Sequence, residues 1–358
     1  MRIAVGIFLI TALAGPVGAQ PSTLPAPTDS ITVTGAKEAA IAKFVETRAA
    51  VSRIAGKIGR WEAGICPIAY GIPPAYGKFV TDRVKDIALQ SGVRVDEKET
   101  CGGNIQIIFT TTPQALMDNI RKEHPVYLGY HDNSTQAEQM TTLKRPVHAF
   151  YTTQTRDFKG RSRIDTTRCR GEGSTLNLPA PPSTGPIPDS SNGMRTMDLG
   201  CANIMAASGF RIGDGISSEF AHIVIVVNTP KVVDLEMGSL SDYIAMLAMS
   251  QPVRFDACQD LPSITNLMID PACAGSTVAT VISAHDLAYL KGLYKMTAGR
   301  SLGLQKGEIS YRMRQAQSGE GKAEIECREA KSTSRLGGKR ECHTPAEWDA
   351  RDTGGRGR

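Results

Sequence analysis

The sequence predicts a disulfide-stabilised domain of the α+β or α/β class, in which a mixed sheet is flanked by helices. Residues 220–230, FAHIVIVVNTP, form a nearly continuous apolar run of strand length, and such a run is typical of a buried strand. A strand of this kind that leads into an amphipathic helix is the usual centre of an α/β core. The helical spacing of apolar residues follows at Leu240, Ile244, Leu247 and Ala248.

Length and composition are those of a globular protein. The chain has 358 residues, of which 41% are hydrophobic and 22% are charged, enough for one large domain or two small ones. The formal net charge of +5 is small for this length, and no cluster of Lys and Arg stands out in the predicted folded region. Nucleic-acid binding is therefore disfavoured.

The N-terminus has the three parts of a secretory signal peptide. These are a Met-Arg start, the apolar run IAVGIFLITALA, and small residues at 17–19 as a cleavage site. The apolar run is shorter than the roughly 20 residues that span a bilayer, and no later segment reaches that length. We predict that residues 1–19 are removed by cleavage near Ala19. The mature chain, without a transmembrane segment, is then periplasmic or extracellular in a Gram-negative organism.

All eight cysteines lie in the part predicted to be exported, and an even count in an exported chain indicates disulfides. Eight cysteines permit about a hundred pairings, so we favour pairs of neighbours. A metal site is disfavoured, because the spacings are long and irregular and no C-x-x-C occurs. The favoured pairs are Cys66–Cys101, Cys169–Cys201, Cys258–Cys273 and Cys327–Cys342.

Changes in composition predict the domain organisation. Residues 20–35 begin with a Pro/Ser/Thr-rich stretch that has little to bury, which indicates a disordered spacer. Residues 36–317 form the α/β domain, and residues 318–358 form a polar, Gly-rich tail. Within the domain, residues 169–201 have many prolines and no apolar periodicity, which predicts a surface loop closed at its base by a disulfide.

The elements of the domain follow from apolar periodicity and from turn and cap residues. In the first half they alternate as strand and helix, and the later part is mainly helical. The predicted elements are strands at 64–70, 93–95, 104–110 and 146–152, a helix from Phe79 to Gly92, a helix from Thr112-Pro113, a helix with Ser283 as its N-cap, and a helix from about Leu304 to Gln315.

Few residues suggest catalytic chemistry. None of the six histidines forms the H-x-x-x-H pair that places two imidazoles on one zinc ion. His124 and His131 are surface-loop residues or a weak metal or acid–base site, His222 lies on the central strand, and His285 lies by the start of a helix. Neither G-x-S-x-G nor a P-loop occurs, so we predict no cofactor and no metal.

Ser241 and Asp242 lie near the start of the predicted central helix. An N-cap followed by a first-turn acid is favoured there over a catalytic carboxylate. Asp242, His222 and His285 remain the candidates for a catalytic group.

With these residues in view, the chain resembles uncharacterised exported bacterial proteins that have a metalloprotease-like (zincin-like) helix. In those proteins the helix usually has the motif His-Glu-Glu-x-x-Gln, whereas Ser241-Asp242-Tyr243 and Met246 occupy the corresponding positions here. A lone Asp does not hold a catalytic zinc, so the resemblance implies a scaffold that has lost the metal chemistry. It covers roughly residues 59–315, and the matching residues are Arg60-Trp61, Asn104, Pro262-Ser263-Ile264 and Leu293-Tyr294.

The tail is similar to a short Cys…Ser-Arg…Cys-x-Thr-x-x-Glu-Trp motif at the ends of many small exported bacterial proteins. The matching residues are Cys327, Ser334-Arg335, Cys342, Thr344 and Glu347-Trp348. The resemblance implies a disulfide-closed hairpin or loop and no particular activity.

Three functional hypotheses remain. The first is a non-catalytic envelope protein that binds a partner or a cell-wall component, or serves as a scaffold. The second is a hydrolase in which the fold brings Asp242, His222 and His285 together, and it requires a histidine within about 3 Å of the carboxylate. The third, an accessory of an outer-membrane receptor, depends only on ITVTG at 31–35, which resembles a segment of such receptors.

Overall fold

The computed structural model describes residues 29–98, 101–166, 175–178, 195–198, 213–269, 271–318, 326–329 and 340–343. The chain forms two compact units, Met1–Lys37 and Glu38–Arg358, and the fold below is that of the second. Its helices are α1 (Asp29–Arg48, which begins in the first unit), α2 (Pro74–Ser91), α3 (Pro113–Glu123), η1 (Pro125–Leu128), α4 (Ser134–Thr141), α5 (Thr229–Val232), α6 (Met237–Met249), η2 (Ile264–Asn266), η3 (Gly275–Thr277), α7 (Ala284–Lys295) and α8 (Leu302–Ser318). Its strands are β1 (Gly59–Arg60), β2 (Pro67–Tyr70), β3 (Ile105–Thr110), β4 (Val147–Arg156), β5 (Ser162–Ile164), β6 (Thr175–Leu178), β7 (Arg195–Asp198), β8 (Ser217–Asn228), β9 (Glu326–Glu329) and β10 (Arg340–His343).

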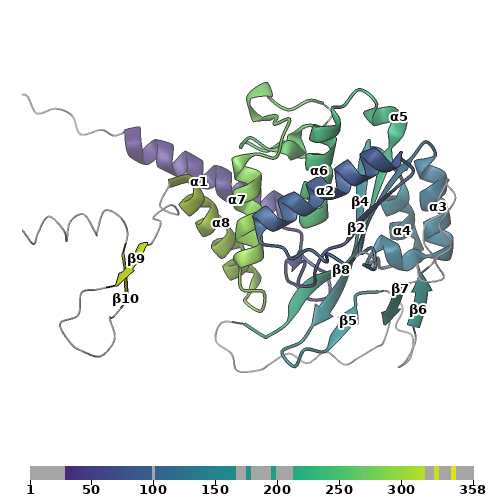
Figure 1. Cartoon of the computed structure of the whole chain (residues 1–358), viewed down its shortest axis with the longest axis horizontal. Helices are drawn as coiled ribbons and strands as arrows, with labels where there is room; N and C mark the ends of the chain where they lie inside the picture. Colours follow the sequence, from purple (N-terminus) through teal and green to yellow (C-terminus); the bar gives the residue numbers. More distant parts are fainter. Residues whose placement is uncertain are drawn as a thin grey trace, which may run out of the picture. The chain divides into compact units, whose positions relative to one another are not determined.

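A six-stranded mixed sheet forms the centre of this unit, and β8 is its central strand (Figure 1). β3 pairs in parallel with the second half of β8, and β2 pairs in parallel with β3. The short strand β1 pairs in parallel with the first half of β8. On the other side, β4 runs antiparallel to β8, and β5 runs antiparallel to β4. Residues 220–228 of the apolar run thus lie in the central strand, Thr229 and Pro230 begin α5, and the predicted fold class is confirmed.

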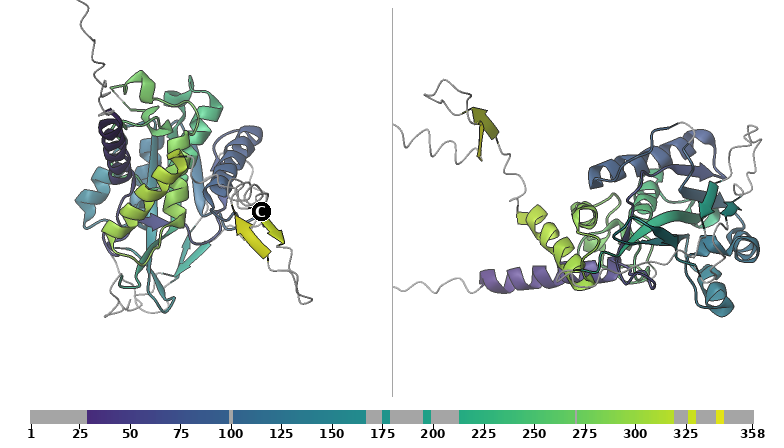
Figure 2. Two further views of the ribbon diagram at one scale, coloured as in Figure 1. Left: turned by 90° about the vertical axis from the view of Figure 1, so that its left-hand side faces the viewer. Right: turned by 90° about the horizontal axis from the view of Figure 1, so that it is seen from below.

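Both faces of the sheet are covered by helices (Figures 1 and 2). On β8, Ile223 and Ile225 point into a core that α1, α2, α6, α7 and α8 complete. Val224 and Val226 point into a second core with residues of α3, η1 and α4. Because successive side chains alternate between two buried faces, the stretch from Ile223 to Val227 is apolar without interruption and does not alternate with polar residues.

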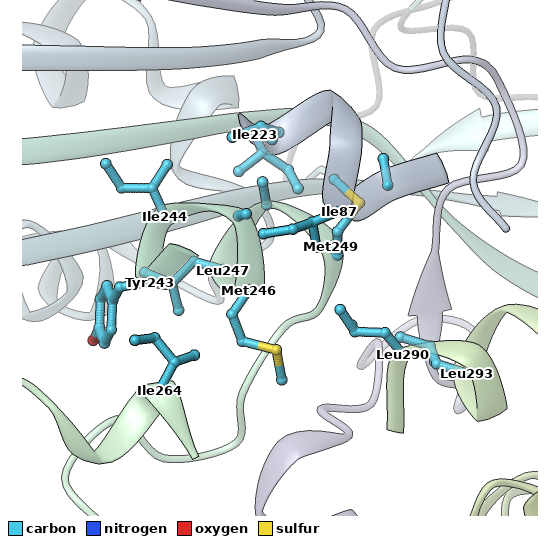
Figure 3. Close-up of a cluster of buried hydrophobic side chains, with 14 of the residues drawn as sticks. Ile87, Ile223, Tyr243, Ile244, Met246, Leu247, Met249, Ile264, Leu290 and Leu293 are labelled. Carbon is cyan, nitrogen blue, oxygen red and sulfur yellow. The ribbon is translucent and has the colours of Figure 1, made fainter. Parts of the chain in front are cut away.

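α6 is buried on all sides. Every residue from Ser239 to Met249 is buried, and Figure 3 shows Ile244 and Met246 of α6 among side chains of other elements, Ile87, Leu290 and others. The prediction of an amphipathic helix is therefore wrong: α2, β8 and η2 all pack against it, so α6 has no polar face turned to solvent, and its polar residues Ser241 and Asp242 are buried with hydrogen-bond partners.

The backbone carbonyl groups at the C-terminal end of α6 accept hydrogen bonds from aromatic side chains. The last carbonyl groups of a helix have no partner within the helix, and here they lie in the core, away from water. Three aromatic side chains from separate parts of the chain supply the hydrogen bonds. The pairs are Trp61 Nε1 to Ala248 O (2.8 Å), Tyr294 OH to Met249 O (2.7 Å), and Tyr151 OH to Leu247 O (2.9 Å) or Ser250 O (3.1 Å).

Removing one of these donors is expected to destabilise the protein. Tyr294→Phe keeps the ring but leaves the Met249 carbonyl without its donor, which should lower the free energy of unfolding by about 1–3 kcal/mol. Tyr311→Phe is the matched control, because the Tyr311 side chain is 53% exposed. Urea unfolding followed by circular dichroism measures both, and equal midpoints for the two variants would contradict the proposed role of the hydroxyl.

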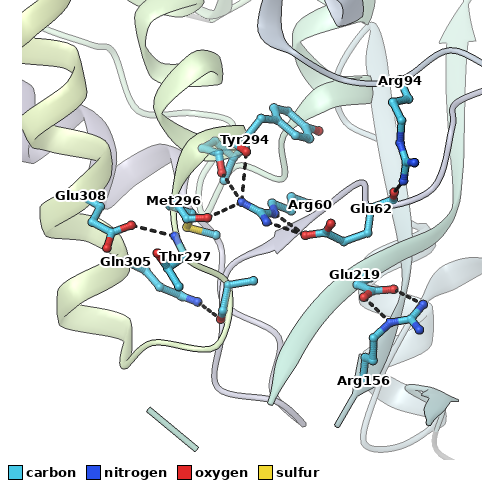
Figure 4. Close-up of polar contacts among 12 residues, drawn as sticks. Arg60, Glu62, Arg94, Arg156, Glu219, Tyr294, Met296, Thr297, Gln305 and Glu308 are labelled. Carbon is cyan, nitrogen blue, oxygen red and sulfur yellow. Dashed lines mark hydrogen bonds and ion pairs between the residues drawn. The ribbon is translucent and has the colours of Figure 1, made fainter. Parts of the chain in front are cut away.

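The polar residues of the Arg-Trp and Asn motifs bind backbone groups. Arg60 Nη1 donates to the carbonyls of Leu293 (3.1 Å), Tyr294 and Met296 at the C-terminal end of α7 (Figure 4), where a positive charge is favourable. Asn104 accepts the N–H of Cys66 (2.6 Å) and donates to the carbonyl of Gly64 (2.9 Å), joining the start of β3 to the segment before β2. The motif residues of the resemblance thus hold elements together.

Two of the four predicted disulfides are confirmed. Cys66–Cys101 and Cys258–Cys273 are bonded, with Cα–Cα distances of 5.9 Å and 5.7 Å. Cys327 and Cys342 lie opposite each other in the antiparallel β9–β10 pair, and their disulfide stays a prediction. Cys169 and Cys201 lie outside the described residues, as does the predicted signal peptide.

Three predictions of local structure need correction. α1 begins at Asp29, inside the predicted spacer 20–35, so the Ala-rich helical pattern extends further toward the N-terminus. Residues 93–95, which follow the C-cap Gly92 of α2, contribute only an isolated bridge between Ile65 and Val95 rather than a strand. The predicted loop 169–201 contains the antiparallel strands β6 and β7, because pairing of two short strands requires no apolar periodicity.

Among the described residues, no helix combines the length and the apolar composition that crossing a membrane requires.

Candidate functional site

Asp242 is neither a helix cap nor a solvent-exposed acid. α6 begins at Met237, so Asp242 lies beyond the first turn, and it is 1% exposed. Its two carboxylate oxygens accept hydrogen bonds from Nε and Nη2 of Arg83 on α2, the second at 2.9 Å. The backbone N–H of Ile282, just before α7, donates to the same carboxylate at 2.7 Å. The carboxylate therefore links α2, α6 and the start of α7, and the cap prediction for Ser241 and Asp242 is wrong.

The structure does not bring the three catalytic candidates together. The ring of His222 packs against the ring of Tyr127, with centroids 4.8 Å apart, and Tyr127 belongs to the core that contains α3 and α4. Asp242 lies on α6, on the opposite face of the sheet. His285 is in the first turn of α7, and the Asp242 carboxylate binds Arg83 and the Ile282 N–H rather than a histidine. The acid–base arrangement that the hydrolase hypothesis requires is not formed by these residues.

His124 and His131 have local roles. His124 is the residue after the last turn of α3, and its ring lies edge-on to Tyr127 at 6.4 Å. His131 Nδ1 lies 3.0 Å from the carbonyl of Gly129. Across the part of the chain that the structure describes, no three His, Cys, Asp or Glu side chains come together in a group that could hold a metal ion.

Asp286, which the sequence analysis did not single out, is the most connected buried acid near α7. It accepts hydrogen bonds from Ser263 Oγ (2.6 Å), the Ile264 N–H (2.9 Å) and the Ser283 N–H (3.0 Å). Burial raises the pKa of this carboxyl group, and the hydrogen bonds oppose that rise. Ser283 is the N-cap of α7, as predicted, in a reciprocal capping box with Asp286. A Ser followed by Asp three residues later was the signal that could have identified it.

The carboxyl ends of the parallel strands define the candidate site. After β2 the chain continues into α2 on one face of the sheet, whereas after β3 it continues into α3 on the other. In open α/β sheets, ligands bind outside the carboxyl ends of the strands at such a change of direction. Thr110, Thr112 and Asn228 are at this edge, and Thr110 and Asn228 are register partners at the ends of β3 and β8.

This edge has hydroxyl and amide groups. Thr111 and Thr112 are exposed, and the side chains of the N-cap residues Thr112 and Asn228 make no capping hydrogen bond to their helices. Hydroxyl, amide and first-turn N–H groups can donate hydrogen bonds to a polar or anionic ligand. The arrangement suits recognition of a ligand, and Thr110, Thr111, Thr112 and Asn228 include no nucleophile–base pair.

The His148 side chain accepts hydrogen bonds from the turn before β4, next to the carboxyl end of β8. Its Nε2 accepts the backbone N–H groups of Arg145 (2.9 Å) and Lys144 (3.2 Å). Burial, followed by the charges of Arg145 and Lys231, lowers the pKa of His148 from 6.5 to about 4. The imidazole is therefore neutral in the folded protein at neutral pH, and its proton is on Nδ1 because Nε2 is the acceptor.

The low pKa of His148 predicts a loss of stability in mild acid. The His148 side chain takes up its proton near pH 6.5 in the unfolded chain and only near pH 4 in the folded protein. Its contribution to the free energy of unfolding is therefore present above pH 6.5 and is lost as the pH falls toward 4. It amounts to about 3 kcal/mol. His148→Gln retains an acceptor that does not titrate, and its free energy of unfolding should fall less over this interval. Urea unfolding at a series of pH values measures the difference, and parallel curves for the two proteins would disprove the prediction.

Fold and site together define a disulfide-stabilised α/β domain with helices on both faces of a mixed sheet and a polar strand edge. Comparison with protein-family models, with curated proteins and with solved structures finds no match. The likeness to exported proteins with a zincin-like helix stays a hypothesis drawn from the motifs.

Proposed function

We propose that this chain is an exported, non-catalytic binding or scaffold protein of a Gram-negative cell envelope. The observation that supports export most is the pair of disulfides, Cys66–Cys101 and Cys258–Cys273. Structural disulfides form and persist in oxidising compartments and are rare in the cytosol. The predicted signal peptide at residues 1–19 supports the same compartment.

The role of Asp242 supports the non-catalytic part of the proposal. A catalytic carboxylate must reach its substrate, directly or through one water molecule. Asp242 is 1% exposed, and its oxygens are bound by Arg83 and by the Ile282 N–H. The residue that corresponds to the catalytic helix motif of the zincin-like proteins therefore has a structural role, and the polar strand edge is the surface on which a partner or a cell-wall component would bind.

Cell fractionation with thiol alkylation tests export. The full chain is produced in a Gram-negative host beside a variant that lacks residues 2–19. The full chain should be found in the periplasm or the medium, begin near Gln20, and resist alkylation unless it is first reduced. The variant without the segment should stay in the cytoplasm with reactive thiols. Full-length chain that keeps its N-terminus and free thiols in the cytoplasm would overturn the proposal.

A further inference from the structure

A hairpin between β4 and β5 extends from one end of the central sheet. The turn of this hairpin follows Arg156, whose register partner Ser217 is the first residue of β8. The turn therefore lies at the amino end of β8, whereas the polar strand edge lies at its carboxyl end, and Figure 1 shows β5 and α5 at opposite ends of the sheet. The hairpin is thus a surface separate from the candidate site described above.

The side chain of Asp157 fixes the turn at the tip of this hairpin. Its Oδ1 accepts the backbone N–H groups of Lys159 (2.9 Å) and Arg161 (3.0 Å), and its Oδ2 accepts Nε of Arg161 at 2.9 Å. Gly160 has a φ of 81°, which glycine adopts without strain, and its N–H donates to the Asp157 carbonyl at 2.9 Å. Because Asp157 is buried and bound through both oxygens, the backbone of the tip is held in a defined conformation.

The tip presents an apolar ring to solvent. Phe158 is 49% exposed, and the Nζ of Lys159 lies 5.8 Å from the centroid of its ring, within the range of a cation–π contact. A single exposed aromatic residue is common on protein surfaces. What this ring indicates therefore depends on the charges around it.

Basic side chains surround this ring. Arg161 and Arg163 are two residues apart in extended chain, so they lie on one face of the hairpin, and Arg156 lies on the other. Other residue types separate the basic residues along the sequence, so no run of Lys and Arg is visible there, and the hairpin gathers them at its tip. The basic residues are Arg156, Lys159, Arg161 and Arg163.

Carboxylates balance only part of this charge. Arg156 is paired with Glu219, and Arg161 is paired with Asp157 at 2.7 Å. Within the described residues, neither Lys159 nor Arg163 has an ion pair with a carboxylate. Four basic residues and two carboxylates leave an excess of two positive charges beside the exposed ring.

We propose that the β4–β5 hairpin is a docking surface for an anionic phospholipid bilayer. Phe158 inserts between lipid headgroups, and Lys159 and Arg163 bind their phosphate groups. A bilayer of this kind is anionic at its surface and apolar beneath, and long basic side chains keep their charged ends at the headgroups while their stems contact the apolar layer. A soluble anionic polymer offers the charges without the apolar layer, so the bilayer is the partner that fits both features.

The inference goes beyond the proposed function, because it concerns a second surface and does not depend on export. The first measurement is the fluorescence of Phe158→Trp in the oxidised full chain, with the signal of the wild-type tryptophans subtracted. Phosphatidylglycerol vesicles should shift the emission of the introduced indole to shorter wavelengths, because the ring leaves water. Phosphatidylcholine vesicles, which carry no net charge, should leave it unchanged. The readout is local to the hairpin tip, so binding elsewhere on the chain does not contribute.

Removing the uncompensated charges tests the electrostatic part. In the Phe158→Trp background, Lys159→Gln and Arg163→Gln should each weaken binding to phosphatidylglycerol vesicles about fivefold, and both together about 25-fold. Lys291→Gln is the matched control, because it removes one positive charge from an exposed lysine of α7, and its affinity should equal that of the parent. An unchanged affinity in the double-charge variant, or an equal loss in Lys291→Gln, overturns the proposal.

A soluble polyanion, dextran sulfate, separates a bilayer from an anionic polymer. An emission shift with phosphatidylglycerol vesicles alone supports the bilayer. No shift with these vesicles, or an equal shift with phosphatidylcholine, overturns the proposal. If dextran sulfate binds, Lys159→Gln weakens that binding and the vesicles cause no shift, the hairpin binds a polymer instead. All of these measurements use purified protein, so failure of this surface and failure of export in the fractionation experiment are distinguishable.

Discussion

Arg83→Met is expected to lower the free energy of unfolding by about 3–5 kcal/mol. The substitution leaves the Asp242 carboxylate buried with only the Ile282 N–H as a partner, and removing one member of a buried ion pair has a cost of this size. The Arg83 side chain is 34% exposed and Asp242 is 1% exposed, so the loss comes from the uncompensated carboxylate rather than from the missing guanidinium.

The double variant Arg83→Met with Asp242→Leu tests whether the two residues stabilise the fold only as a pair. Replacing both members by apolar side chains removes the unpaired charge, so most of the lost stability should return. Denaturant unfolding of the wild type, both single variants and the double variant gives the coupling energy. The sum of two independent losses in the double variant would contradict the idea that Arg83 and Asp242 act as a pair. Export should be unchanged in the double variant, because neither residue belongs to the predicted signal peptide or to a disulfide.

Loss of the Cys66–Cys101 disulfide is expected to lower the free energy of unfolding by an amount similar to that for Arg83→Met. This bond closes a loop with a sequence separation of 35 residues, and the chain-entropy model assigns about 4 kcal/mol to a loop of that length. Cys66 lies directly before β2, and β2 pairs with β3, so the bond fastens one edge of the sheet. The double variant Cys66→Ser with Cys101→Ser avoids a free thiol and should unfold at a lower denaturant concentration under oxidising conditions.

The second disulfide provides the internal comparison. Cys258–Cys273 has a sequence separation of 15 residues, for which the same model gives about 3 kcal/mol. Unfolding of both double Ser variants with and without reductant tests the assignment: reductant should destabilise the wild type more than either variant. If the Cys66/Cys101 variant matched the wild type under oxidising conditions, the bond would not stabilise the fold.

The local elements were predictable because they depend on neighbours in the sequence. The run 220–230, the cap residue Ser283 and the Thr112-Pro113 helix start are patterns within a few residues, and the structure contains β8, α7 and α3 at these places. Pairing of neighbouring cysteines also succeeded for the two bonds that the structure describes, because short loops bring such residues close. The mixed sheet followed from the strand and helix order.

The candidate site was not predictable in this way. From the sequence, Ser241 and Asp242 are indistinguishable from an N-cap and a first-turn acid, because their place in the helix depends on where α6 begins. The partner of Asp242, Arg83, lies 159 residues away in the sequence. Likewise, Phe255 meets the Arg145 guanidinium only through the packing of the loop after α6. Their spacing in the sequence shows no pattern.

The sequence by itself determined the elements, the fold class and two disulfides, because hydrophobic periodicity and cap chemistry act over a few residues. Only the tertiary structure decided which charges are neutralised and which are left available. Burial and long-range pairing set that balance: they bind Asp242 to Arg83 inside the core, enclose α6 among aromatic donors, and leave Arg145 stacked on Phe255 without a carboxylate in the described chain.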